Sequence, residues 1–330
     1  MSVGVFIGRF QPVHEGHLSA LAQASSRCMN LIILVGSADQ CRSIKNPWTF
    51  AERKAMLTKK LHEKGIRNFF IQPLNDYPYN DPQWINNVRE TVEYTKQHTE
   101  YGQVVLFGHW KEGNDYLKWF PDWKFQDLQA TVHMNATQVR EEMFKALDLD
   151  MPRQAQSDWD YYQQEAKTFA GYPFPATLNF NCGDAVVECQ GHILLVQRGK
   201  ENGPGYTSWA LPGGFKNRNE TFKDCAIREL LEETSIKVPE KVLRGSIVGS
   251  QLFDSPKRSF GINRNTLAVY IRVHPDPDGK PPKVKAADDA MDCKWVPLNE
   301  ALNKYALYDD HKAIISSMTG VMPRPAYLNQ

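Results

Sequence analysis

The chain lacks an excess of charge of either sign. Its 330 residues contain 39 Lys and Arg against 38 Asp and Glu, which gives a formal net charge of +1. Such a balance provides no general attraction to nucleic acid or to an acidic membrane surface, so we expect neither as a partner. This balance does not exclude a local basic pocket that binds a small phosphorylated ligand.

Long hydrophobic runs and the common nucleotide-binding fingerprints are also missing. The apolar run at residues 31–35 is far shorter than the roughly 18 residues of a membrane-spanning helix. The first ten residues have neither the basic region nor the apolar stretch of a secretory signal. No P-loop lysine motif and no Gly-x-Gly-x-x-Gly occurs. The six cysteines form no Cys-x-x-Cys pair, so we expect reduced thiols and a cytoplasmic protein.

The length and the pattern along the chain predict two domains, since a domain takes roughly 150 residues. Residues 1–170 alternate short β-type runs with helical stretches, which is typical of a doubly wound α/β domain with ligands at the carboxyl ends of parallel strands. We expect strands near residues 3–7, 31–35, 68–72 and 103–107, and helices near 17–28, 51–64 and 83–97.

The second half, residues 171–330, predicts an α+β domain with a mixed sheet. It is separated from the first by a polar, helical or irregular connector at about residues 145–170, with the boundary near Gly171. We expect strands near residues 185–189, 192–197, 242–250 and 266–273, and one helix near 220–233.

Two histidines three residues apart follow the first expected strand. A helix that begins near Gly16 would place His14 and His17 at its N-terminus, where free amides and the helix dipole favour an anion. Arg9 adds a cation, and Gly8 permits close approach of a ligand to the backbone. The pattern predicts a site that neutralises charge during attack on a nucleotide α-phosphate; simple capping histidines are the alternative.

The run at residues 8–18 resembles the His-x-Gly-His motif of the nucleotidylyltransferase superfamily, in particular its archaeal-type nicotinamide-mononucleotide adenylyltransferases. That resemblance implies synthesis of NAD and pyrophosphate from ATP and nicotinamide mononucleotide with Mg²⁺. A second family motif, Ile-Ser-x-Thr-x-x-Arg, is matched at Thr137 and Arg140, while Met134 and Asn135 replace its first two residues. Arg140 would bind the β- and γ-phosphates of ATP with support from Thr137, and Asn135 can still cap a helix.

The same resemblance implies further substrate-binding residues. Asn46 begins an Asn-Pro-Trp-Thr segment like that of the archaeal-type branch. Trp84 stands where that branch stacks a Trp on the cationic nicotinamide ring, with packing in the core as an alternative of nearly equal weight. Gly108 and His109 are weaker candidates, because they end a strand at the expected ligand edge. The expected substrate-binding set in this half is Gly8, Phe10, Arg42, Asn46, Trp84, Gly108 and His109.

A run of glutamates marks the second domain. Glu220 follows Gly214 after five residues, and seven more separate it from the segment Arg-Glu-Leu-Leu-Glu-Glu. On a helix Glu229, Glu232 and Glu233 share one face. Hard divalent ions take oxygen ligands, so these carboxylates and the Gly214 carbonyl predict a metal site for attack of water on a diphosphate, with a Glu as general base. A solvated acidic face is the alternative.

This run resembles the Nudix box of diphosphate hydrolases, except that Ser235 replaces its final glycine. The two resemblances cover nearly the whole chain and imply an archaeal-type nicotinamide-mononucleotide adenylyltransferase fused to a Nudix hydrolase that cleaves ADP-ribose to AMP and ribose 5-phosphate. Arg258 would supply a cation to that substrate. Mg²⁺ is the implied metal, with Mn²⁺ as a substitute.

The expectations for the two sites are specific, and alternatives remain. Another mononucleotide for the first domain, with NADH or another dinucleotide for the second, fits the motifs as well. A non-hydrolysing ADP-ribose sensor is disfavoured because the box glutamates are present and no basic recognition helix is. The sequence also leaves assembly into a homo-oligomer as a possibility. The expected catalytic residues are Arg9, His14, His17, Thr137, Arg140, Glu229 and Glu232, and the expected metal-binding residues are Gly214, Glu229, Glu232 and Glu233.

Overall fold

The computed structural model describes residues 2–97, 102–109, 118–129, 135–173 and 178–329. It divides into two compact units. The N-terminal unit comprises Met1–Arg42, Asn46–Pro152 and Pro325–Gln330, and the C-terminal unit comprises Ser43–Lys45 and Arg153–Arg324. None of the described helices is both long and apolar enough to cross a membrane.

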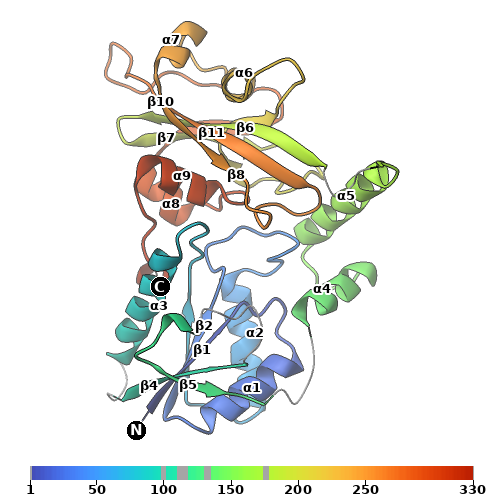
Figure 1. Cartoon of the computed structure of the whole chain (residues 1–330), viewed down its shortest axis with the longest axis vertical. Helices are drawn as coiled ribbons and strands as arrows, with labels where there is room; N and C mark the ends of the chain where they lie inside the picture. The colour runs from blue at the N-terminus through green and yellow to red at the C-terminus, as the bar shows by residue number, and fades with distance from the viewer. Residues whose placement is uncertain (1, 98–101, 110–117, 130–134, 174–177, 330) are drawn as a thin grey trace. The chain divides into compact units, whose positions relative to one another are not determined.

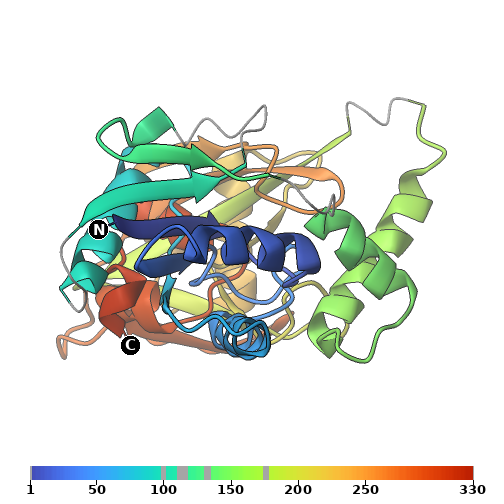
Figure 2. The ribbon, with the colours of Figure 1, turned by 90° about the horizontal axis from the view of Figure 1, so that it is seen from below.

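The N-terminal unit is built on a five-stranded sheet in the order β3-β2-β1-β4-β5 (Figure 1). All neighbouring strands are parallel, and β1 lies beside β4 in the view from below (Figure 2). This confirms the predicted parallel sheet, although the last strand was not expected. The strands are β1 (Ser2–Gly8), β2 (Asn30–Val35), β3 (Phe69–Pro73), β4 (Gln103–Gly108) and β5 (Lys124–Asp127).

Helices cover both faces of this sheet. Alternate residues of β2 point to opposite faces, so Ile33 joins the core that contains Leu21 and Leu57, whereas Ile32 joins the core that contains Val88. The predicted doubly wound arrangement is therefore confirmed. The helices are α1 (Glu15–Ser25), α2 (Phe50–Glu63), α3 (Asp81–Lys96) and α4 (Ala136–Lys145).

The C-terminal unit has a mixed sheet in the order β10-β11-β6-β7-β12, with two short strands at its side. β11 and β6 are parallel, whereas β6–β7, β7–β12 and β10–β11 are antiparallel. The predicted mixed sheet is thus confirmed. Its strands are β6 (Asn179–Cys189), β7 (His192–Arg198), β8 (Trp209–Ala210), β9 (Gly213–Phe215), β10 (Ile247–Phe253), β11 (Asn263–Arg272) and β12 (Ala290–Pro297).

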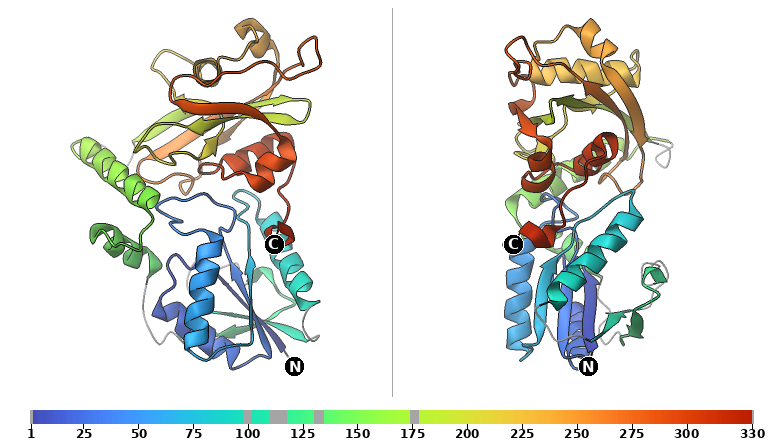
Figure 3. Two further views of the ribbon diagram at one scale, coloured as in Figure 1. Left: turned by 180° about the vertical axis from the view of Figure 1, so that it is seen from behind. Right: turned by 90° about the vertical axis from the view of Figure 1, so that its left-hand side faces the viewer.

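Helices lie on both faces of the mixed sheet as well. α6 covers one face and α8 and α9 cover the other (Figure 3). The helices are α5 (Arg153–Phe169), α6 (Phe222–Thr234), α7 (Glu240–Gly245), α8 (Leu298–Lys304) and α9 (His311–Thr319). A short 3₁₀ helix, η3 (Ala326–Asn329), follows and packs with the N-terminal unit, where Tyr327 contacts the Tyr94 ring.

One strand expected in this half needs correction. The strand expected at residues 242–250 begins only at Ile247, because Pro239 and Glu240 start the short helix α7, in which Arg244 pairs with Glu240 at 2.7 Å. The two compact units divide after Pro152, and α5 belongs to the C-terminal unit by its contacts. The expected domain boundary near Gly171 stays a prediction.

Candidate functional site

The His-x-Gly-His segment forms the start of α1, as predicted. His14 is the N-cap residue, and its Nδ1 accepts a hydrogen bond from the backbone N–H of His17 at 3.4 Å. The two imidazoles stack with centroids 3.7 Å apart. The helix N-terminus that offers free amides to an anion therefore carries both rings side by side.

Phe10 supports this pair instead of facing a ligand. Its side chain is only 1% exposed and its ring centroid lies 4.8 Å from that of His17. A Cβ on Gly8 would come within 3.0 Å of the Phe10 ring. Gly8 is therefore needed for packing, and Phe10 is buried against His17; the expected contact of Phe10 with substrate stays a prediction.

The second predicted motif meets the first. Arg140 is 6% exposed, and its guanidinium donates to the Gln11 carbonyl and, at 3.2 Å, to the Thr137 hydroxyl. The predicted support of Arg140 by Thr137 is present. Asn135 caps α4 by accepting from the N–H of Thr137 at 2.9 Å, so its substitution for Ser preserves the cap; Met134 lies outside the described residues.

A third arginine at this site was missed from the sequence. Arg53 is fully buried in α2, where its guanidinium donates to the carbonyls of Arg9 at 2.6 Å and Gly36 at 2.7 Å. Burial, with the nearby charge of Arg9 as a further cause, lowers the pKa of Arg53 and of Arg140 to about 10. The backbone that follows β1 and β2 is thus held by a buried positive charge.

Gln11 joins the first motif to the Asn-Pro-Trp-Thr segment. Its amide donates to the Trp48 carbonyl at 2.8 Å and accepts from the Trp48 N–H at 3.1 Å. The same segment ends at Thr49, which caps α2 in a capping box with Glu52. Arg42, expected to bind substrate, pairs with Glu52 at 2.6 Å and thereby braces the start of α2.

The remaining expected substrate contacts lie at or near the carboxyl edge of the sheet. Trp84, in the first turns of α3, packs edge-on to Trp119 with centroids 5.9 Å apart. His109 follows β4, and its Nδ1 lies 2.6 Å from the Leu128 carbonyl. Gly108 accepts from the Leu128 N–H at 2.9 Å. The stacking role of Trp84 and the substrate contacts of Asn46, Gly108 and His109 stay predictions.

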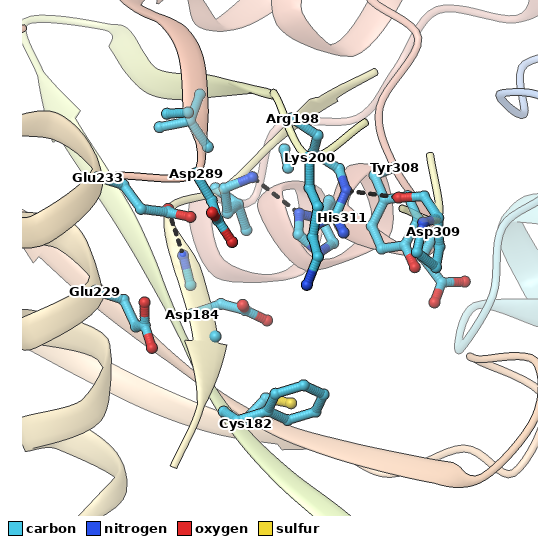
Figure 4. Close-up of a pocket in the computed structure, with 18 of the residues that line it drawn as sticks. Cys182, Asp184, Arg198, Lys200, Glu229, Glu233, Asp289, Tyr308, Asp309 and His311 are labelled. Atoms are coloured by element: carbon cyan, nitrogen blue, oxygen red, sulfur yellow. Dashed lines mark hydrogen bonds between the residues drawn. The ribbon is translucent and has the colours of Figure 1, made fainter. Parts of the chain in front are cut away.

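The C-terminal unit contains a pocket of about 420 Å³, a size typical of small-molecule sites. Carboxylates from α6 and β6 lie at one end, and Tyr308 and Asp309 lie at the other (Figure 4). Its ionisable lining includes Asp184, Arg198, Lys200, Arg228, Glu229, Glu232, Glu233, Arg258, Arg264, Asp288, Asp289, Asp309 and His311.

Arg228 organises the glutamates of α6. It forms a two-pronged ion pair with Glu220, at 2.9 and 3.0 Å, and also contacts Glu229 and Glu232 at 2.8 Å each. Its backbone partner is the Phe215 carbonyl at 3.0 Å. Arg228 therefore connects α6 to the loop before it, through Glu220 and the Phe215 carbonyl.

Glu233 is the most perturbed of these carboxylates. Burial, opposed by the Gly213 N–H that donates to it at 3.1 Å and reinforced by nearby Glu229 and Asp184, raises its pKa to about 8. Burial also raises the pKa of Glu229. A cation would relieve this crowding of partly buried negative charge.

The two glycines of the loop make room for the same carboxylates. A Cβ on Gly213 would lie 2.0 Å from Asp184 Oδ1, and a Cβ on Gly214 would lie 2.5 Å from Glu229 Oε1. This set of hard oxygen donors fits a divalent ion in its chemistry. Within the described residues, however, no three acidic, His or Cys side chains already stand in a metal-binding arrangement. Glu229 and Glu232 each form an ion pair with Arg228.

Ser235 occupies the position of the missing box glycine with φ +41° and ψ +36°. Its left-handed backbone ends α6, and its N–H donates to the Leu231 carbonyl at 3.0 Å. The position therefore needs the conformation that glycine adopts most easily.

Arg258 lines the pocket but is already neutralised. Its guanidinium is buried and donates to both carboxylate oxygens of Asp310 at 2.9 Å. A direct role toward substrate is thus less suited to Arg258 than to Arg198 and Lys200, which also line the pocket. Arg264 lines the pocket as well, but it forms an ion pair with Glu165. None of these three was predicted: Arg198 ends β7, Lys200 follows it, Arg264 lies in β11, and no sequence motif marks either segment.

Family models match both halves of the chain. Residues 5–146 match the cytidylyltransferase-like family, and residues 183–318 match the NUDIX domain. The nicotinamide/nicotinic acid mononucleotide adenylyltransferase of Acinetobacter baylyi is 36% identical over 144 residues, which cover 43% of this chain and 74% of that protein. The nicotinamide-nucleotide adenylyltransferase of Pyrococcus horikoshii is 41% identical over 90 residues, 27% of this chain, and the match spans about half (48%) of its length.

A solved structure matches both units. It is a bifunctional NMN adenylyltransferase/ADP ribose pyrophosphatase from Francisella tularensis, complexed with AMP and an Mn ion. The TM-score is 0.85 at 30% sequence identity, with 97% of this chain and 98% of that chain covered.

Proposed function

Because the chain belongs to the family of bifunctional NMN adenylyltransferase/ADP-ribose pyrophosphatases, we propose one reaction for each unit. The N-terminal unit transfers AMP from ATP to nicotinamide mononucleotide and releases pyrophosphate, which forms NAD. The C-terminal unit hydrolyses ADP-ribose to AMP and ribose 5-phosphate.

The observation that carries the first activity is the contact of Arg140 with the Gln11 carbonyl, which joins the two phosphate-binding motifs. In the reaction, a phosphate oxygen of the mononucleotide attacks the α-phosphorus of ATP, and the bond to the leaving pyrophosphate breaks. His14 and His17 donate hydrogen bonds to the α-phosphate, and Arg9 and Arg140 neutralise the departing phosphates. The backbone contacts of Arg53 and Gln11 hold this cluster in place.

The observation that carries the second activity is the pocket in which the Glu229 and Glu233 carboxylates meet Asp184 beside the glycine loop. Glu229, Glu232 and Glu233, with the Gly214 carbonyl, would hold divalent metal, for which Mg²⁺ is our choice. Bound metal would polarise the diphosphate and lower the pKa of the attacking water. Glu229 or Glu232 accepts the proton of that water while a phosphorus–oxygen bond of the diphosphate breaks.

Product analysis tests both reactions. Purified protein is incubated with ATP, nicotinamide mononucleotide and Mg²⁺, and separately with ADP-ribose and Mg²⁺, and the products are resolved by chromatography. We expect NAD and pyrophosphate in the first mixture, AMP and ribose 5-phosphate in the second, and neither set in EDTA. Parallel reactions with nicotinate mononucleotide and with NADH measure the preference for these substrates. Faster turnover of NADH than of ADP-ribose would contradict the second assignment.

A further inference from the structure

α5 supplies part of the pocket wall although it lies outside the segment that matches the NUDIX domain. Tyr161 and Tyr162 line the pocket, whereas the matched segment begins only at residue 183. α5 belongs to the C-terminal unit by its contacts. The pocket therefore has a wall that the Nudix fold alone does not provide.

Three contacts anchor α5 beside the pocket. Asp158 accepts a hydrogen bond from the Gly205 N–H at 3.3 Å, the Tyr162 hydroxyl lies 3.4 Å from that of Tyr308, and Glu165 forms an ion pair with Arg264. These residues stand at i, i+4 and i+7, so they share one face of the helix. The face is held at successive turns, which fixes the tyrosines that it carries.

The two tyrosines differ in what they can offer. Tyr162 is 7% exposed and is packed between Phe260, at a centroid distance of 5.3 Å, and the Arg264 guanidinium, 5.5 Å from its ring. Tyr161 is half-buried, and its ring stands edge-on to Tyr162 at 5.4 Å and 87°. Tyr162 is thus a fixed support, and Tyr161 is the ring that a ligand can reach.

Through Tyr162, this wall reaches the end of the pocket away from the α6 carboxylates. Tyr308, which contacts Tyr162, lies opposite Glu229 and Glu233 (Figure 4). Arg198 stacks over the Tyr308 ring at 4.2 Å, which adds a second planar group. A diphosphate held at the carboxylate end would direct its nucleoside or sugar toward these planar groups.

We propose that α5 is a base-recognition element of the hydrolase site, with Tyr161 stacking on the adenine of the AMP half of the substrate. A nucleobase has the flat π-face that such a ring can stack on, whereas ribose phosphate has none. The proposal rests on the proposed ADP-ribose hydrolysis. It specifies that the enzyme recognises the AMP half of this substrate.

Product inhibition of hydrolysis tests the proposal, because it reports on this site even if AMP also binds the other unit. The variants are Tyr161→Leu, Tyr161→Phe and the control Tyr172→Leu, which changes a 42% exposed tyrosine outside the pocket. In Tyr161→Leu we expect the AMP inhibition constant to rise at least about fivefold, typical of a lost base stack, with no change for ribose 5-phosphate. Tyr161→Phe and the control should resemble the wild type.

Two results would overturn the proposal. Unchanged AMP inhibition in an active Tyr161→Leu enzyme would remove the stacking role, as would an equal loss of inhibition by both products. These outcomes leave ADP-ribose hydrolysis by the wild type intact, so they count against α5 alone. A wild-type protein that leaves ADP-ribose uncleaved would overturn the proposed function and this proposal together.

Discussion

Glu233→Gln should make the metal-free protein more stable, and more so as the pH rises. The folded structure raises the pKa of Glu233 from 4.5 to about 8, chiefly by burial. Between these values the folded state keeps a proton that the unfolded state has lost, so the wild type loses stability as the pH rises toward 8. Gln keeps the size and can still accept from the Gly213 N–H without carrying this charge.

The size of the effect follows from the two pKa values. At pH 7 the raised pKa costs the wild type about 3 kcal/mol, and at pH 5 about 1 kcal/mol. For a unit of this size each kcal/mol shifts the melting temperature by about 2–4 °C. Glu233→Gln should therefore melt about 6–12 °C higher at pH 7 and about 2–4 °C higher at pH 5, in EDTA.

Scanning calorimetry in EDTA at the two pH values measures these shifts, and the control is Glu232→Gln. Glu232 has a 46% exposed side chain and shares Arg228 with two other carboxylates, so its replacement should change stability by less than about 0.5 kcal/mol. Added Mg²⁺ should stabilise the wild type more than Glu233→Gln. A Glu233→Gln protein that gains no more at pH 7 than at pH 5 would refute the reasoning.

Three further substitutions test other parts of the structure. Trp84→Ala should raise the KM for nicotinamide mononucleotide about 5- to 30-fold, through loss of a cation–π contact, while the KM for ATP stays constant; equal changes in steady-state kinetics would make Trp84 a packing residue only. Arg140→Lys loses the two-directional contact with Gln11 and Thr137, so initial-rate assays should show a lower kcat for NAD synthesis and no change in ADP-ribose hydrolysis, a result that equal loss of both rates would contradict. Ser235→Gly relieves a left-handed non-glycine residue and should raise the melting temperature by about 2–4 °C with both activities kept, whereas a lower melting temperature would show that the serine side chain is needed.

The local patterns were sufficient to predict most of the fold. The apolar runs at β1, β2 and β4 and the helices between them are confirmed, because a buried parallel strand needs continuous apolar residues. β5 was missed, since its sequence Lys-Phe-Gln-Asp has a single apolar residue and lies at the sheet edge. The C-terminal part of α7 was taken for a strand because Val242 and Leu243 were read together with the β-type run that begins at Ile247, and the start signal at Pro239 was missed.

The sites were predictable where neighbouring residues carry the chemistry. The spacing of His14 and His17, and of the α6 glutamates, follows from helix geometry and is present in the structure. Arg53 and Asp184 could not be predicted, because each reaches its site only through the packing of α2 or the register of β6 with β9. The burial of Phe10 could not be predicted either, since its position after the strand did not reveal that its backbone adopts φ +54° and turns the ring into the core.

The most direct test of two independent sites is to assay both reactions in two single variants. In the same preparations, NAD synthesis and ADP-ribose hydrolysis are measured for the wild type, His17→Ala and Glu233→Gln. His17→Ala should lose NAD synthesis by at least about a hundredfold, as expected for one lost transition-state donor, and keep hydrolysis. Glu233→Gln should lose ADP-ribose hydrolysis and keep NAD synthesis. A folded variant in which one substitution abolishes both reactions, or in which neither reaction falls, would contradict the account.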